Sequence, residues 1–225
     1  MSQPSSIKRK SSSVHLIERI NRLSQYGISM DLSEELEESG KDRCESFLEG
    51  ARTPSHYPGS APSQVQTILR RVQDLNEGRL HRDITPWIVP SAENAYRNGE
   101  IIPHYLVDEV QAEWTRCAPM GSTRPKPDLT VGLSLNDFTE EETQKLKARS
   151  SLGRPSFVAP NLCYPFIMAE AKTLNKADRQ DVHSAGIAVN AIIELQKAAF
   201  ETTEPDRVQA LFRKPLVFSV SHNGR

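Results

Sequence analysis

The spacing of hydrophobic residues divides the chain near residue 63. Before it, an amphipathic stripe predicts one short helix over 14–26, and residues 31–49 carry a thin apolar face among eight acidic and two basic residues. After it, apolar residues at i, i+3, i+4, i+7 and i+10 predict a helix with Ser63 as its N-cap. This stripe consists of Val65, Ile68, Leu69, Val72 and Leu75. The folded domain is therefore expected to begin at about residue 63.

Three apolar segments in the second half predict strands, over residues 127–133, 164–172 and 215–221. A capping box that starts at Thr139 predicts a short helix between the first two strands. A long helix over 178–200 separates the last two, with Val182, Ala185, Val189, Ile192 and Ala199 as its expected buried stripe. The order strand, insertion, strand, helix, strand predicts an α/β domain with a mixed central sheet flanked by helices.

The segment between residues 80 and 117 has a less regular pattern. Prolines and glycines interrupt residues 80–103, which are expected to be irregular. Residues 104–117 place Leu106, Val110 and Trp114 on one face of a helix and predict a further helix there.

The N-terminal part is expected to lie outside the domain. Residues 1–13 are polar, Ser-rich and basic, which predicts a disordered tail. Its cluster Lys8-Arg9-Lys10 fits a nuclear address, a phosphate-contacting tail or a solvated terminus. Residues 14–62 then form a helical and acidic segment that ends in a linker rich in Pro and Gly over 50–63.

Composition and charge limit the classes of protein. Lys and Arg total 28 against 29 for Asp and Glu, which argues against a globally basic nucleic-acid binder but leaves room for a local basic groove. No segment approaches the roughly 18 apolar residues that a membrane helix requires, and no apolar core of a secretory signal follows the basic N-terminus. The three cysteines lack the spacing of a zinc site or a disulfide framework. We therefore expect an intracellular protein of the nucleus or cytoplasm without a membrane span.

The strongest candidates for catalysis or metal binding lie at the start of one predicted strand and near the end of another. Asp128 starts the first strand, and Glu170 and Lys172 share one face near the end of the second. If the two strands are neighbours, two carboxylates meet, and a hard divalent cation such as Mg²⁺ removes their repulsion. Lys172 would then orient or deprotonate an attacking water and offset charge on a phosphate. The alternative from the residues alone is a surface ion pair of Glu170 and Lys172, worth about 0–1 kcal/mol.

Asp128 and the triplet Glu170-Ala171-Lys172 resemble the PD-(D/E)XK signature of restriction-endonuclease-like nucleases. The segments KPDLTVGLS, YPFIMAEAKT and PLVFSVSHNGR, with an Ala-rich helix before the last, are similar to fungal PD-(D/E)XK nuclease-like proteins. The resemblance covers about residues 63–225 and implies a PD-(D/E)XK core. It also implies a further strand and helix after Arg225, so the domain is expected to be incomplete at its C-terminus.

The resemblance implies a set of ligands and a reaction. Asp128, Glu170 and the backbone carbonyl of Ala171 would hold Mg²⁺, or Mn²⁺ in its place, and Lys172 would be the catalytic lysine. A further glutamate would come from the helix expected over 104–117, where Glu113 is favoured slightly over Glu109. Weaker candidates for contact with a substrate are Gln180, His183, Trp87, Trp114, Arg124 and Lys126.

Two classes of function follow from the resemblance. The first is a metal-dependent nuclease that hydrolyses phosphodiester bonds, with DNA favoured over RNA as its partner. The second is a catalytically inert PD-(D/E)XK-like module that acts in protein interaction. The acidic residues 31–49 and the near-neutral net charge of −1 favour this second class.

Overall fold

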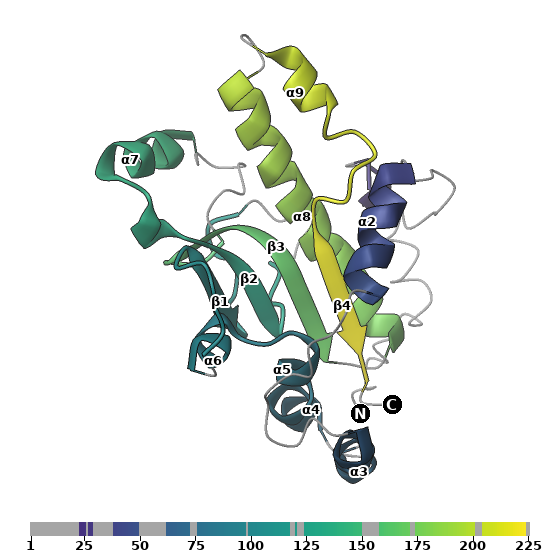
Figure 1. The fold of residues 1–225 in the computed structure, drawn as a ribbon. Helices are drawn as coiled ribbons and strands as arrows, with labels where there is room; N and C mark the ends of the chain where they lie inside the picture. The colour runs from purple at the N-terminus through teal and green to yellow at the C-terminus, as the bar shows by residue number, and fades with distance from the viewer. Residues whose placement is uncertain are drawn as a thin grey trace, which may run out of the picture.

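The computed structural model describes residues 23–25, 27–28, 38–49, 62–72, 76–97, 99–117, 120, 124–149, 158–171, 174–200 and 204–223 of the 225-residue chain. Within these ranges, the chain forms a mixed four-stranded sheet flanked by helices (Figure 1). The predicted tail over 1–13 lies outside the described residues, as do residues 50–61 of the predicted linker and most of the predicted helix over 14–26.

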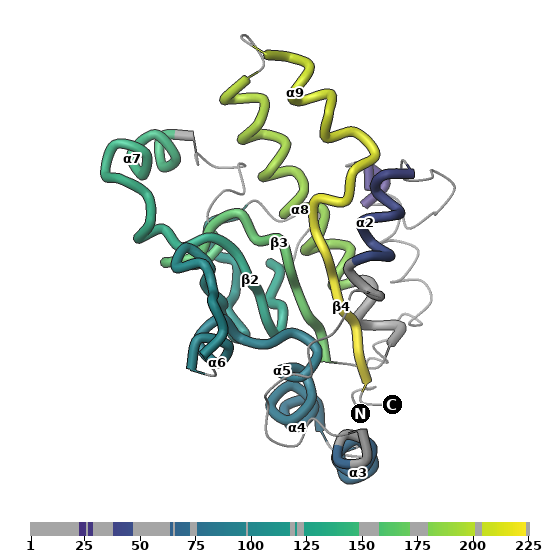
Figure 2. Tube along the Cα trace, in the orientation of Figure 1, coloured from purple at the N-terminus to yellow at the C-terminus, as the bar shows by residue number. Residues whose placement is uncertain are grey.

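The sheet has the strand order β1-β2-β3-β4. The first three strands are antiparallel neighbours, whereas β4 runs parallel to β3. Figure 2 shows β4 beside β3, although the whole of α8 separates them along the chain. The strands are β1 (Leu106–Val110), β2 (Leu129–Ser134), β3 (Leu162–Ala171) and β4 (Phe218–His222). The prediction of three strands in one mixed sheet is therefore confirmed.

The long helix α8 (Leu174–Phe200) connects β3 to β4 and packs on one face of the sheet. Met168 of β3 is completely buried against Ile187 and Ala188 of this helix, together with Trp114. The residues of α8 that face the sheet lie about one position away from the predicted buried stripe. They include the small Ala188 and Ala191. Small side chains allow the helix to approach the strands closely.

The opposite face of the sheet is covered by short helices from the first half of the chain. Val89, which follows one of them, packs on Leu129, Val131 and Ala169. Ala171 at the end of β3 packs against two others through Val72, Leu80 and Ile84. These helices are α3 (Pro62–Val72), α4 (Glu77–Asp83), α5 (Thr85–Ile88) and α6 (Ala92–Arg97), the last of which lies next to β1.

The remaining helices are peripheral to the sheet. Thr139 and Glu142 exchange hydrogen bonds at the start of α7, as the predicted capping box requires. α2 falls within the acidic stretch, and a 3₁₀ turn follows β2. These elements are α2 (Glu38–Glu49), η1 (Leu135–Asp137), α7 (Glu140–Arg149) and α9 (Pro205–Gln209).

The pairing of β2 with β3 contains a bulge. The register shifts between Val131 and Leu133, opposite a stretch of β3 in which Tyr164 has φ of +46° and precedes Pro165. A Cβ on Gly132 would lie 2.8 Å from the carbonyl oxygen of Cys163, so only glycine fits there. The bulge lets a proline sit within an inner strand, where it cannot donate to the ladder.

Two predictions about residues 80–117 are wrong. Residues 104–117 do not form a helix, because 106–110 are strand β1 and Trp114 is buried from the loop that follows. The apolar spacing fits a helix, but Leu106 and Val107 lie on opposite faces of a strand and the ladder with β2 decides the outcome. Residues 80–103 are not irregular either, since α4, α5 and α6 occupy most of them. Asn76 caps α4, and Pro86 stands in the first turn of α5, where its missing N–H is not needed.

In the described ranges, no helix has both the length and the apolar character that crossing a membrane demands.

Candidate functional site

Five polar side chains gather where β2 begins and where β3 and β4 end. Parallel strands end at the same edge of a sheet, and the antiparallel β2 starts at that edge. We call this group the sheet-end cluster. It consists of Asp128, Glu170, Asp181, Ser221 and His222, of which Asp181 comes from α8.

Asp128 is held in place by the backbone of β3. Its Oδ2 accepts a hydrogen bond of 2.8 Å from the N–H of Ala171. Leu129 pairs with Ala169, so one further step along the register places Asp128 beside Glu170. The structure thus brings together the two carboxylate residues that the sequence places 42 positions apart. Both are buried.

Glu170 is 1% exposed, which is unusual for a carboxylate side chain. Met168, two residues earlier, packs on α8, so strand alternation directs Glu170 to the same side of the sheet. The neighbouring position on β4 is Ser221. A buried carboxylate requires polar or charged partners to offset its lost hydration, and this side of the sheet end supplies them.

Asp181 joins the cluster from the first third of α8. The hydroxyl of Ser221 donates a hydrogen bond to its Oδ2, which ties β4 to the helix. Asp181 is 2% exposed, and His183 and Ser184 next to it are buried as well. Sequence reasoning selected Gln180 and His183 in this segment and missed Asp181. The available signal was an acidic residue one position before the apolar stripe of the helix.

His222 lies on the opposite side of β4 from Ser221. Its Nε2 and the hydroxyl of Thr85 on α5 form a buried hydrogen bond of 2.8 Å. Burial lowers the pKa of His222, the carboxylate of Asp128 opposes this shift, and His81 adds to it. The imidazole is therefore neutral at neutral pH. Sequence reasoning missed both Thr85 and His222, because the contact joins segments 137 residues apart.

Several predicted site residues fall elsewhere. Lys172 lies outside the described residues, so its place beside Glu170 stays a prediction. Glu113 is exposed in the loop after β1, and Glu109 stands on β1 opposite Thr130. The resemblance implied that a helix over 104–117 would carry one of these glutamates to the cluster. Residues 106–110 form a strand instead, so no such helix places either glutamate there.

Of the weaker candidates, Trp114 is explained by packing. It is completely buried, and its indole N–H donates to the hydroxyl of Thr130 over 3.4 Å. It is therefore part of the core and has no surface on which a base can stack. Arg124 and Lys126 are exposed in the segment before Asp128.

The buried cysteines are not suited to nucleophilic chemistry. Burial raises the pKa of Cys117 to about 11 and that of Cys163 to about 12, so both thiols stay protonated. This agrees with the sequence, which shows no nucleophilic cysteine motif.

A metal ion would have few side-chain ligands at the cluster. Across the described part of the chain, no three His, Cys, Asp or Glu side chains are grouped so as to hold a metal ion. Asp128 and Glu170 contribute two carboxylates, and Ala171 adds a backbone carbonyl. Such a set suits a cation that keeps several of its waters, as Mg²⁺ does.

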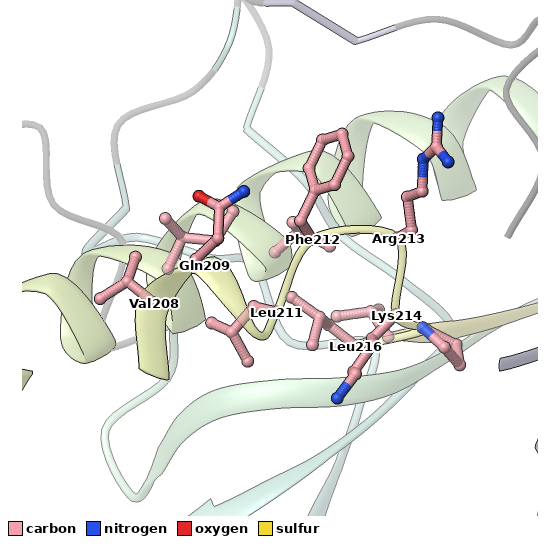
Figure 3. A pocket seen from close by; sticks show the side chains of 11 residues that line it. Val208, Gln209, Leu211, Phe212, Arg213, Lys214 and Leu216 are labelled. Carbon is pink, nitrogen blue, oxygen red and sulfur yellow. The ribbon is translucent and has the colours of Figure 1, made fainter. Parts of the chain in front are cut away.

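A hollow of about 480 Å³ lies away from the cluster, between α8, α9 and the connection to β4. Its walls are mostly apolar, with Arg213 and Lys214 as its cations. Phe212 and Arg213 point to the same side of the connection (Figure 3), and the guanidinium of Arg213 lies 5.4 Å from the ring centre of Phe212. No residue of the sheet-end cluster lines this hollow.

The fold and the cluster define an α/β protein with buried acidic groups at one end of a mixed sheet. Residues 64–225 match the family model described as "Domain of unknown function (DUF7924)", and the chain belongs to this family. No curated protein and no solved structure matches the chain.

Proposed function

We propose that the chain is a metal-dependent nuclease with a PD-(D/E)XK core, which hydrolyses phosphodiester bonds of nucleic acid, with DNA as the favoured substrate. One observation carries the proposal. Asp128 and the pair Glu170-Ala171 meet at the end of two adjacent strands, and the Ala171 N–H fixes one oxygen of Asp128. This is the juxtaposition that the PD-(D/E)XK resemblance requires.

The donor atoms fit Mg²⁺ or Mn²⁺. All three are oxygens, from the carboxylates of Asp128 and Glu170 and from the carbonyl of Ala171. In a strand, the N–H and C=O of one residue point to the same side. Since the Ala171 N–H points to Asp128, its carbonyl belongs on that side as well. Within the described residues, the Asp128 carboxylate makes no second hydrogen bond, so its Oδ1 is available for a cation.

Each residue of the site would have a different role in hydrolysis. A bound divalent cation would lower the pKa of water and offset negative charge on the phosphate. Asp128 and Glu170 would hold it, and the hydrogen bond from Ala171 would keep the Asp128 carboxylate from turning away. Lys172 follows β3 directly, and continued alternation of the strand would place it on the side of Glu170. There it would bind the scissile phosphate or accept a proton from the attacking water.

The decisive experiment compares cleavage with metal binding. The full chain is incubated with supercoiled and linear DNA in Mg²⁺, Mn²⁺ or EDTA, beside Asp128→Asn, Glu170→Gln and Lys172→Ala. We expect cleavage only with metal and only in the parent. The exposed Glu140→Gln on α7 is the matched control and should cleave normally.

Melting temperature separates loss of metal from loss of chemistry. Metal should raise it in the parent and in Lys172→Ala, because binding to the folded state alone stabilises that state. The rise should disappear in Asp128→Asn and Glu170→Gln. A folded parent that neither cleaves nor responds to metal would overturn the proposal and favour the second function.

The second function is an inert PD-(D/E)XK-like module that acts in protein interaction. The bond between Ser221 and Asp181 favours it, because it engages an acidic group of the cluster in holding α8 to β4. In that case, the cluster serves stability alone, and a partner protein binds elsewhere on the domain.

A further inference from the structure

Strand β1 is an edge of the sheet, and its backbone hydrogen bonds to β2 show which of its sides is open. Gln111 N–H donates to the carbonyl of Asp128, and Tyr105 C=O accepts from Ser134. Residues 105 and 111 therefore face β2, as do the alternate residues between them. The main-chain groups of Asp108 and Val110 point the other way. Among the described residues, they have no strand beside them.

The segment that leads into this edge strand exposes several large apolar side chains. Six large hydrophobic residues are exposed in the described ranges, and five of them fall between residues 88 and 110. They are Ile88, Tyr96, Ile101, Tyr105 and Val110. Tyr105 and Val110 flank the edge itself, and Ile101 is fully exposed. Exposed apolar side chains beside an open strand edge, as Tyr105 and Val110 are here, indicate an interaction site.

The same region is acidic. Residues 88–113 contain one arginine and no lysine, against five carboxylates at Glu93, Glu100, Asp108, Glu109 and Glu113. Charge complementarity therefore selects a basic partner. A second copy of the chain is disfavoured, because antiparallel pairing of two β1 strands about Asp108 would place acidic residues of both copies together.

We propose that the open edge of β1 binds an extended segment of a partner protein in which Lys or Arg alternates with apolar residues. The partner adds a fifth strand by bonding to the outward N–H and C=O of Asp108 and Val110. Its apolar side chains lie on the face of the sheet that carries Val110, and its cations lie on the opposite face, near Glu109. This surface is separate from the sheet-end cluster, so the proposal does not depend on nuclease activity.

The test uses a fluorescent peptide of alternating Lys and Val, six residues long, and a matched peptide of alternating Glu and Val. Fluorescence polarisation measures their binding to the full chain. Val110→Pro removes an N–H that points away from β2, so the β1–β2 ladder stays intact. Val110→Ala keeps that N–H and is the control. We expect the Lys peptide to bind the parent and Val110→Ala alike, and Val110→Pro to lose about tenfold in affinity or more.

Two further measurements keep the test decisive. Circular dichroism melting tests whether Val110→Pro is folded. In addition, Glu109→Lys should weaken binding of the Lys peptide and strengthen binding of the Glu peptide, a result that does not depend on the proline variant. The proposal is overturned if a folded Val110→Pro binds as the parent does, or if both peptides bind the parent equally. Sedimentation that shows a dimer, lost in Val110→Pro, would overturn it in favour of a second copy.

Discussion

The backbone N–H of Ala171 donates to Oδ2 of Asp128 over 2.8 Å and fixes the start of β2 to the end of β3. A side chain here does what a ladder hydrogen bond does elsewhere in the sheet. The bond is buried, so its loss would leave the N–H without water to replace the carboxylate.

Replacing Asp128 should therefore affect stability in a graded way. Asp128→Ala leaves the Ala171 N–H unsatisfied and should cost about 1–3 kcal/mol in the free energy of unfolding. Asp128→Asn keeps an oxygen acceptor and should cost about 1 kcal/mol or less. Urea denaturation of the full chain measures both. Equal losses in the two variants would contradict a role for the hydrogen bond.

The bond from Ser221 to Asp181 predicts a second difference in stability. Ser221→Ala removes the donor to a buried carboxylate and should destabilise the fold by about 1.5–3 kcal/mol, as for hydrogen bonds to charged groups. Ser219 lies two residues earlier on the same side of β4 and is exposed, so Ser219→Ala is the matched control and should change little. Urea midpoints compare the two, and a similar effect of both substitutions would argue against the Asp181 contact.

Asp108 predicts a pH dependence of stability. Burial and the hydrogen bond with Glu93 raise the pKa of Asp108 to about 7. In the unfolded chain it titrates near 3.9. Because the pKa of Asp108 is higher in the folded state, its protonation adds to the free energy of unfolding. This contribution is complete below about pH 4 and is lost as the pH rises through about 7.

The measurement compares thermal unfolding of the parent and Asp108→Asn between pH 4 and 8. Asparagine stays neutral and retains an acceptor for the N–H of Ala92, so the variant should lose less stability than the parent as pH rises. The lowered pKa of His222 acts in the opposite direction and destabilises as pH falls, but it is common to both proteins. If stability changes with pH to the same extent in both proteins, Asp108 is not the source of the pH dependence.

The bulge in the pairing of β2 with β3 predicts that Gly132 cannot be replaced. Gly132→Ala puts a Cβ 2.8 Å from Cys163 O and from Leu162 Cδ2, and should cost about 1–3 kcal/mol. Gly78→Ala in α4 meets only Asn76 Oδ1 at 3.5 Å and should be neutral or gain up to about 1 kcal/mol. Chemical denaturation of the two alanine variants gives the contrast. A tolerated Gly132→Ala would mean that the bulge relaxes.

The core strands were predictable because their apolar segments differ in period from the helix around them. β2, β3 and β4 each fell within a few residues of the expected range, and so did α8. β1 was not predictable in the same way. Leu106, Val110 and Trp114 fit a helical face, and only the ladder with β2 makes residues 106–110 a strand.

The candidate site was predictable where it depended on neighbouring strands, and unpredictable where it depended on distant packing. The meeting of Asp128 with Glu170 follows from pairing of the strands that carry them. The contact of His222 with Thr85 requires α5 to be packed under the sheet end, which no local pattern specifies. The bond between Ser221 and Asp181 likewise depends on how α8 is rotated about its axis.

The parallel pairing of β3 with β4 also has a consequence for the order of folding. β1 and β2 are separated by 18 residues, whereas 46 residues, including α8, lie between the end of β3 and the start of β4. Closing the longer loop costs more chain entropy, so β4 should join the sheet after the antiparallel strands have paired. Until then, β3 is an edge of the sheet, and Glu170 does not yet have Ser221 beside it. The polar neighbour that β4 provides for this carboxylate is thus expected to arrive late in folding.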